Sequence, residues 1–301
     1  MRAAAAQFAA DYAANPRRRT INEERAKDDA TGGLILGFLW LGVAAKTWWG
    51  GEAGLALLPA SYGLHEATYF ALHRWVPSFR GLYVRFLREI LFIPAMLHTL
   101  ATLITLSVWS HSSILTLHGG SSLRLLLVLA VANGSLAHSM YYPFCGFLLP
   151  YVAAALPLTL LLPLASSRLL CRRLLEDASS TQAVTNLQST LNIAHAAVAG
   201  PFGWSDFPST GADAALPSCI QVNVYLIGLL GCALPLLLAR PLPEQQQQPR
   251  QQRRRQPAEQ QTDGAGALHE TLRRQHLLPR LALASAIAWS IGAAAAFTFG
   301  G

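Results

Sequence analysis

Charged residues are scarce in this chain. Only 13% of its 301 residues are Asp, Glu, Lys or Arg, whereas 52% are hydrophobic. An ordinary soluble domain carries about 25% charged residues, which is nearly twice this share. The scarcity of charge argues against a soluble globular enzyme and directs attention to the long apolar runs.

Cysteine is also rare, and no Cys-x-x-Cys or other metal-ligand spacing is present. Three of the four cysteines lie in or beside apolar segments, so we expect small buried residues rather than a disulfide framework. The sequence has no internal repeat, phosphate-binding glycine loop or nucleophile elbow. Met1–Asn15 lacks the long apolar core of a secretory signal, and a short organelle transit peptide is the alternative interpretation.

Seven segments are apolar enough and long enough to be candidate membrane helices, which need about 20 residues. They are Gly33–Trp49, Gly54–Leu72, Ile90–Trp109, Leu125–Tyr142, Phe147–Ala165, Ile220–Ala239 and Leu281–Phe299. The sequence therefore predicts an all-α, multi-pass integral membrane bundle. We expect two helical hairpins with a cytoplasmic cap, followed by additional C-terminal helices.

The segments divide the chain into five parts. They are a cytoplasmic polar tail (1–32), a membrane core (33–217), an additional membrane helix (218–240), a Gln/Arg-rich linker (241–276) and a last membrane helix (277–301). The linker has too few apolar groups to offset chain entropy, so we expect it to be disordered and residues 245–262 to be dispensable for insertion.

Basic residues give the chain a net charge of +7, and they lie in tails and loops that flank apolar segments. There they set topology and meet anionic headgroups, so we expect a lipid bilayer and no nucleic acid as partner. Segments 1–32 and 74–89 are rich in Arg, whereas the connection 110–122 has none. The positive-inside rule therefore places the N-terminus and 74–89 in the cytoplasm.

Segment 147–165 is ambiguous because it contains Pro150, Pro157 and Pro163, and each proline removes a backbone donor. We expect it to be re-entrant or interfacial, which places His195 on the same side as segment 74–89. A full crossing is the alternative, and it would put the arginines that follow outside, against the charge rule.

Glu66 and His73 are seven residues apart, so on a helix they lie on nearly the same face, with Tyr69 beside them. A carboxylate inside an apolar helix is energetically costly and is by default a functional candidate. On these residues alone we rank the simpler alternative first, in which Glu66 pairs with His65, His73 or a neighbouring helix as a structural contact.

Three motif blocks follow one another along the chain. The first runs from Glu66 through an aromatic cluster to His73-Arg74 and Leu82-Tyr83-Val84-Arg85-Phe86. The second is His138-Ser139-Met140-Tyr141-Tyr142-Pro143, and the third is His195 followed by Gly200-Pro201-Phe202-Gly203. Their order and spacing over residues 54–211 resemble the fatty acid hydroxylase / sterol desaturase superfamily of membrane enzymes.

The resemblance implies lipid metabolism, namely oxidation of a C–H bond of a long-chain acyl or sterol lipid at a diiron centre. His73, His138 and His195 stand at motif positions as candidate metal ligands, and His98 is a weaker fourth. Other residues replace the remaining histidines of the family, and they are Pro77, Leu87, Ile90, Leu91, Leu191 and Ala194. Metal affinity falls steeply as ligands are lost, so we expect diiron oxidation to be weakened or lost, with less than about one iron per chain.

Two classes of function remain open. The first is a divergent hydroxylase-like oxidoreductase, which the resemblance places in the endoplasmic reticulum membrane, another organelle membrane being the alternative. The second is a non-catalytic multi-pass membrane protein that binds lipid or a protein partner. The metal content of the purified protein separates the two.

Overall fold

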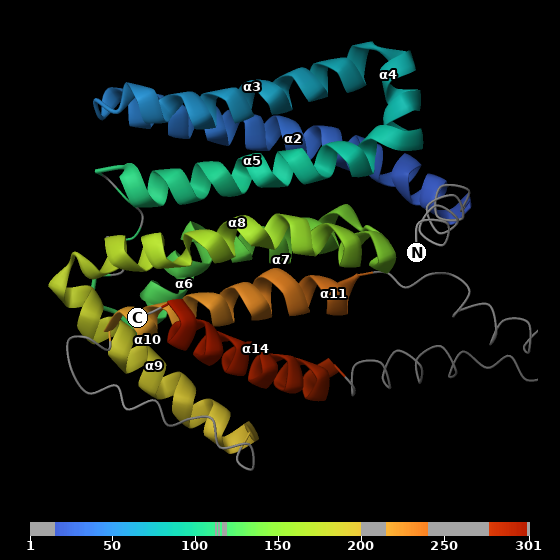
Figure 1. Cartoon of the computed structure of the whole chain (residues 1–301). Helices are drawn as coiled ribbons and strands as arrows, with labels where there is room; N and C mark the ends of the chain where they lie inside the picture. The colour runs from blue at the N-terminus through green and yellow to red at the C-terminus, as the bar shows by residue number, and fades with distance from the viewer. Residues whose placement is uncertain are drawn as a thin grey trace, which may run out of the picture.

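The computed structural model describes residues 16–111, 113, 115, 119–199, 215–239 and 277–299. In these ranges the regular elements are helices, as the sequence predicts (Figure 1). They are α2 (Pro16–Trp49), α3 (Ala53–Trp75), α4 (Pro77–Leu82), the π-helix η1 (Tyr83–Leu87), α5 (Arg88–Trp109), α6 (Ser122–Ala132), α7 (Ser135–Cys145), α8 (Leu149–Leu175), α9 (Ala178–Ala199), α10 (Ala215–Leu226), the π-helix η4 (Ile227–Ala233), α11 (Leu234–Leu238) and α14 (Leu277–Phe299). The linker 241–276 and the end of the third motif block lie outside the described residues.

Helices α2 and α3 pack against each other and lie side by side along one edge of the bundle (Figure 1). Gly51, at a positive φ of 83°, makes the turn between them. The two helices approach closely where glycines face each other, since a Cβ atom on Gly63 would lie 2.9 Å from the Gly37 carbonyl oxygen. Small residues therefore allow the contact that aligns α3 against α2.

Four helices are long and apolar enough to cross a membrane: Thr20–Trp49, Arg88–Trp109, Leu149–Leu175 and Ala215–Leu238. A fifth crossing is counted if α6 and α7 form one bent span. Helix α3 and the described apolar part of α14 (Arg280–Ala296), which the sequence also predicts as spans, are not among the four. The protein is accordingly a helical membrane protein.

The prolines do not interrupt segment 147–165, which removes the ground for expecting a re-entrant or interfacial segment there. Helix α8 runs without interruption through Pro157 and Pro163, while Pro150 sits in its first turn, where the backbone N–H has no partner in any helix. Prolines are tolerated inside membrane helices because neighbouring helices support the chain, and α8 packs against α5 and α10. The continuous helix removes the reason for expecting His195 at the same end as segment 74–89.

The break lies instead in the fourth segment, between α6 and α7, which meet at 68°. Gly134 makes the bend with a φ of 74°, a conformation that side chains with a Cβ rarely adopt. A Cβ atom there would also lie 2.1 Å from Leu100 Cδ2. Glycine is required at this position by both its backbone conformation and its packing.

Cys171 of α8 and Cys219 of α10 form a disulfide, which corrects the expectation of small buried cysteines rather than disulfides. Both are completely buried in the core of the C-terminal half. Their separation of 48 residues gives no sequence signal, because only the packing of α8 on α10 brings them together. Cys145 and Cys232 are free.

The bundle has two distinct ends (Figure 1). The start of α2, helix α4 and the start of α5 meet at one end, where Arg88 pairs with Asp29. The α2–α3 turn and the connection from α5 to α6 lie at the other end. There Glu52 accepts hydrogen bonds from the Ser110 hydroxyl at 2.7 Å and from the His111 backbone N–H.

Candidate functional site

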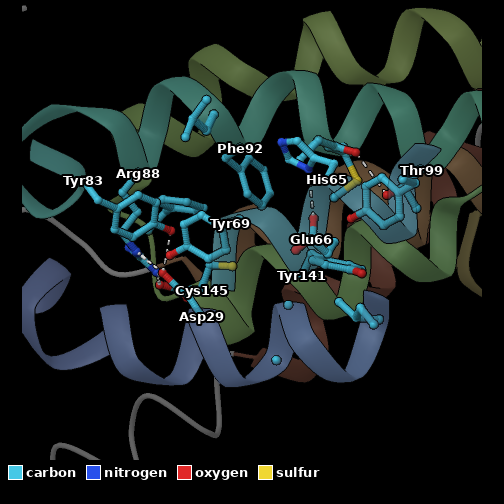
Figure 2. Close-up of a pocket in the computed structure, with 18 residues that line it drawn as sticks. Asp29, His65, Glu66, Tyr69, Tyr83, Arg88, Phe92, Thr99, Tyr141 and Cys145 are labelled. Carbon is cyan, nitrogen blue, oxygen red and sulfur yellow. Dashed lines mark hydrogen bonds and ion pairs between the residues drawn. The ribbon is translucent and has the colours of Figure 1, made fainter. Parts of the chain in front are cut away.

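A cavity of about 130 Å³ lies among α2, α3, α5 and α7, toward the end of the bundle that holds the Asp29–Arg88 pair (Figure 2). We call it the Glu66 cavity. Its apolar lining consists of Leu36, Leu91, Phe92, Ala95, Met96 and Phe147. Its polar lining consists of Asp29, Tyr62, His65, Glu66, Tyr69, Tyr83, Arg88, Thr99, Tyr141 and Cys145, and Gly32 and Gly33 complete the wall.

Helix α3 supplies the central polar residues. Tyr62, Glu66 and Tyr69 are spaced by four and three positions, so they share one face of the helix, and this face lines the cavity. Gly33 of α2 lies opposite, and a Cβ atom there would be 2.7 Å from Glu66 Oε2. The absence of a side chain at Gly33 makes room for the carboxylate in the cavity wall.

Glu66 is only 8% exposed, yet its ionic partner is weak. His65 Nδ1 lies 3.5 Å from Glu66 Oε1, and the His65 side chain is 46% exposed. Exposed ion pairs of this kind contribute little, about 0–1 kcal/mol. The carboxylate therefore lies in the cavity wall without a close cationic partner among the lining residues.

Asp29 and Arg88 form a much tighter pair. Arg88 Nε donates to Asp29 Oδ2 at 2.5 Å and Arg88 Nη2 donates to Asp29 Oδ1 at 3.2 Å. The Tyr83 hydroxyl donates to Asp29 Oδ2 at 3.1 Å, and burial raises the pKa of Tyr83, so it stays protonated. Arg88 also donates to Asn22 Oδ1 and to the Cys145 carbonyl, which completes a closed polar cluster.

The π-turn η1 places these groups. Its wider turn lets the Arg88 backbone N–H reach the Tyr83 carbonyl five residues earlier, so both residues lie where α2 passes. Single π-turns of this kind are frequent at functional sites. The π-turn therefore places Tyr83 and Arg88 so that both contact Asp29 at the start of α5.

Two buried polar atoms have no hydrogen-bond partner within the described part of the chain: the Tyr69 hydroxyl and His73 Nε2. His73 is 5% exposed, and its ring packs edge-on against Tyr83 with ring centroids 5.9 Å apart. A buried polar group without a partner costs about 1–3 kcal/mol. Both residues belong to α3, so the two buried atoms without a hydrogen bond in the described residues lie on the same helix.

The structure does not bring together the histidines predicted as metal ligands. His138 is completely buried, with Nδ1 3.0 Å from the Gly134 carbonyl and Nε2 3.0 Å from Thr159 Oγ1. His195 Nδ1 lies 2.7 Å from the Leu191 carbonyl and Nε2 2.9 Å from Ser285 Oγ, with the ring stacked on Trp289. Each ring nitrogen of these two histidines is thus already occupied.

The weaker candidate, His98, contacts Ser61 Oγ at 3.1 Å and the Leu58 carbonyl at 3.3 Å through its Nε2. No group of three or more His, Cys, Asp or Glu able to hold a metal is found among the residues that the structure describes. Imidazole binds iron through a free ring nitrogen lone pair, and the occupied rings of His138 and His195 do not offer one. These residues do not fit the iron site that the resemblance implies.

Sequence reasoning found Glu66 and Tyr69, which the structure places in the cavity wall. It missed Asp29, Arg88 and Tyr141. Asp29 was assigned to a polar tail, although it lies within a helix continuous with the first apolar segment. The available signal was the pair of charges Arg88-Glu89 at the start of an apolar run, which requires a partner inside the protein.

Comparison with known proteins adds no relative: no family model, curated protein or solved structure matches this chain. The likeness to the hydroxylase superfamily accordingly stays a prediction from motifs.

Proposed function

We propose that this membrane protein binds part of an amphipathic lipid or lipid-like molecule in the Glu66 cavity. The observation that carries the proposal is an apolar cavity whose polar wall, on α3, holds a buried carboxylate with a weak partner and a buried hydroxyl with no hydrogen bond to any residue that the structure describes. Binding pockets typically combine a hydrophobic lining with a few such polar groups. The arrangement suits a ligand with both an apolar and a polar part.

The size of the cavity restricts what enters it. About 150 Å³ of apolar cavity is enough to hold a benzene molecule, so 130 Å³ accommodates one small ring or a head with a few carbons. A longer ligand must extend out of the cavity between helices. Helix α2 presents Ile35, Phe38 and Leu39 on its exposed surface, which suits contact of the remaining chain with the bilayer.

A lipid oxidoreductase with a diiron centre is the other class that the sequence left open. It rests on the motif resemblance, and the occupied ring nitrogens of His138 and His195 do not favour it. The proposed binding function needs none of those ligands, because it uses Glu66 and Tyr69 instead.

The proposal includes an orientation in the membrane. The Arg-rich stretch 74–89 lies at the end of the Glu66 cavity, and the positive-inside rule favours the cytoplasm for this end. The disulfide joins the last turns of α8 to the first turns of α10, at the opposite end (Figure 1). Disulfides persist in oxidising compartments, so its position supports the same orientation.

Photo-crosslinking tests the binding function. Protein in neutral maltoside micelles is incubated with a long-chain alcohol that carries a diazirine, and labelled peptides are mapped by mass spectrometry. Labelling should concentrate on peptides of α2, α3 and α5 that line the cavity and should saturate. Ala95→Phe, which fills the apolar side, should reduce it at least about tenfold, since overpacking excludes a ligand from a cavity this small.

The controls use positions that do not line the cavity. Ala154→Phe adds the same ring at an exposed position of α8 and should leave labelling unchanged. A second test variant, Gly33→Ala, introduces a Cβ 2.7 Å from Glu66 Oε2 in the cavity wall and should also reduce labelling. Its matched control is Gly42→Ala, nine residues further along α2, where the new Cβ meets no atom within 4 Å. Unchanged saturable labelling in both Ala95→Phe and Gly33→Ala, in folded protein, would overturn the proposal.

A further inference from the structure

We propose that the Glu66 cavity selects amphiphiles with a protonated amine head, which binds Glu66 and the Tyr69 hydroxyl. This inference rests on the proposed binding function and names the chemistry of the ligand. It follows from the balance of charge, from the aromatic walls and from the unsatisfied acceptors around the cavity.

The charges around the cavity do not cancel. Asp29 and Arg88 neutralise each other at 2.5 Å, which leaves Glu66 as the surplus charge of the lining. His65 is the one other ionisable base in the wall, and it lies 3.5 Å away on a half-exposed side chain. A cationic ligand would supply the close partner that a buried carboxylate requires.

The aromatic residues suit a cation as well. Tyr62, Tyr69, Tyr141 and Phe92 all line the space around Glu66 (Figure 2). The faces of such rings carry negative potential and attract ammonium groups, with larger effect where water is excluded. A carboxylate within an aromatic wall therefore favours an organic cation over a neutral head.

An amine is favoured over a fully methylated ammonium by hydrogen bonding. The Tyr69 hydroxyl is buried beside Tyr83 but makes no well-formed hydrogen bond within the described residues, so its oxygen can accept an ammonium N–H. Glu66 can accept a second N–H from the same group. Charge-assisted hydrogen bonds of this kind are about twice as strong as neutral ones.

An anionic head is disfavoured because the guanidinium of the cavity is already engaged. Arg88 has five N–H donors, and four of them are used by Asp29, Asn22 and the Cys145 carbonyl. Its plane also stacks on Phe147, 4.6 Å from the ring centroid. A phosphate or carboxylate would find no free cation there and would meet Glu66.

The test is competition against the photoactivatable alcohol in the same micelles, using four ligands with one dodecyl chain. Dodecylamine should compete at least about tenfold better than dodecanol, the scale of one hydrogen bond to a charged group. Dodecyltrimethylammonium should lie between them, and dodecanoate should be weakest. Glu66→Gln should remove the advantage of the amine over dodecanol.

Two further variants keep the outcomes separate. Tyr69→Phe should lower the preference for the amine over the trimethylammonium compound. Glu52→Gln, which changes a carboxylate at the opposite end of the bundle, should preserve every preference. Equal competition by amine and alcohol in the native protein would overturn this inference while the binding function stands. Saturable labelling that stays unchanged in both Ala95→Phe and Gly33→Ala would overturn the binding function itself.

Discussion

The polar residues buried in the two halves of the bundle differ in how fully they are hydrogen-bonded. In the C-terminal half Asn133 Nδ2 donates to Asn223 Oδ1 at 2.8 Å, and Asn223 Nδ2 donates to Ser167 Oγ at 2.9 Å. Gln188 Nε2 donates to Gln221 Oε1 at 2.8 Å. These amides link helices α6, α8, α9 and α10, so their polarity is used to fix how the helices pack.

The N-terminal half leaves polar groups incompletely satisfied along α3. Glu66 has a distant partner, and Tyr69 and His73 each have a buried atom without one in the described chain. A folded protein tolerates such groups mainly where function requires them. The contrast teaches that burial of a polar residue is a poor guide to its role, whereas the completeness of its hydrogen bonding separates a structural contact from a binding site.

The largest effect is expected at the bend of the well-packed half. Gly134→Ala forces a Cβ into a positive-φ conformation and to 2.1 Å from Leu100 Cδ2, so the unfolding free energy should fall by about 2–5 kcal/mol. Thermal unfolding in detergent measures the loss. Gly51→Ala has the same sign of φ but meets no atom within 4 Å, and its smaller loss isolates the packing contribution. Equal losses would mean that backbone strain alone matters.

A smaller loss is expected from the amide network. Asn223→Ala leaves Asn133 Nδ2 without its acceptor and removes the donor to Ser167 Oγ, which still donates to the Pro163 carbonyl. The unfolding free energy should fall by about 1–3 kcal/mol. The matched control is Asn186→Ala. Asn186 is exposed, and its side chain accepts a hydrogen bond from Gln182 at 3.3 Å, so its replacement should lower the unfolding free energy by less than about 0.5 kcal/mol. Denaturation by a graded harsh detergent compares the two variants.

The comparison predicts the opposite sign in the other half. Glu66→Gln removes a buried charge with a weak partner, so the unfolding free energy should stay unchanged or rise by up to about 1 kcal/mol. Thermal unfolding without added ligand measures this. A loss as large as that of Asn223→Ala would show that Glu66 is a structural contact, and the distinction between the two halves would fail.

The smallest effect concerns pH at the turn end. The pKa of Glu52 is lowered because its carboxylate accepts hydrogen bonds from Ser110 and from the His111 N–H. A lowered pKa means that the ionised form stabilises the fold above the ordinary pKa of 4.5, and this contribution is lost as pH falls through the folded-state pKa. The midpoint of thermal unfolding should therefore fall more steeply below about pH 4.5 in native protein than in Glu52→Gln. Parallel curves would contradict the assigned contacts.

Local features of the fold could be predicted from the sequence, and long-range ones could not. The packing of α2 against α3 followed from Gly50-Gly51-Glu52 between two apolar runs, and the shared face of Glu66 and Tyr69 followed from their spacing. The prolines of α8 do not interrupt the helix as the segment alone suggests, because their effect depends on the neighbouring helices.

The partners of the site lie beyond sequence reasoning for a related reason. Arg88 meets Asp29 across 59 positions, and no local pattern indicates that pair. The bend at Gly134 is equally nonlocal, because one glycine in an apolar run has several explanations, and contact with Leu100 decides among them. The spacing of residues in the sequence predicts which of them share a face of a helix, but the residues that this face contacts depend on how the helices pack.

The link between Cys171 and Cys219 has a consequence for the connectivity of the molecule. It closes a covalent ring that contains the end of α8, all of α9 and the start of α10. A single proteolytic cut within the ring leaves one covalent molecule, whereas a cut in the α2–α3 turn releases two. Electrophoresis without reductant should therefore show intact mass after cleavage inside the ring, and two fragments only once reductant is added.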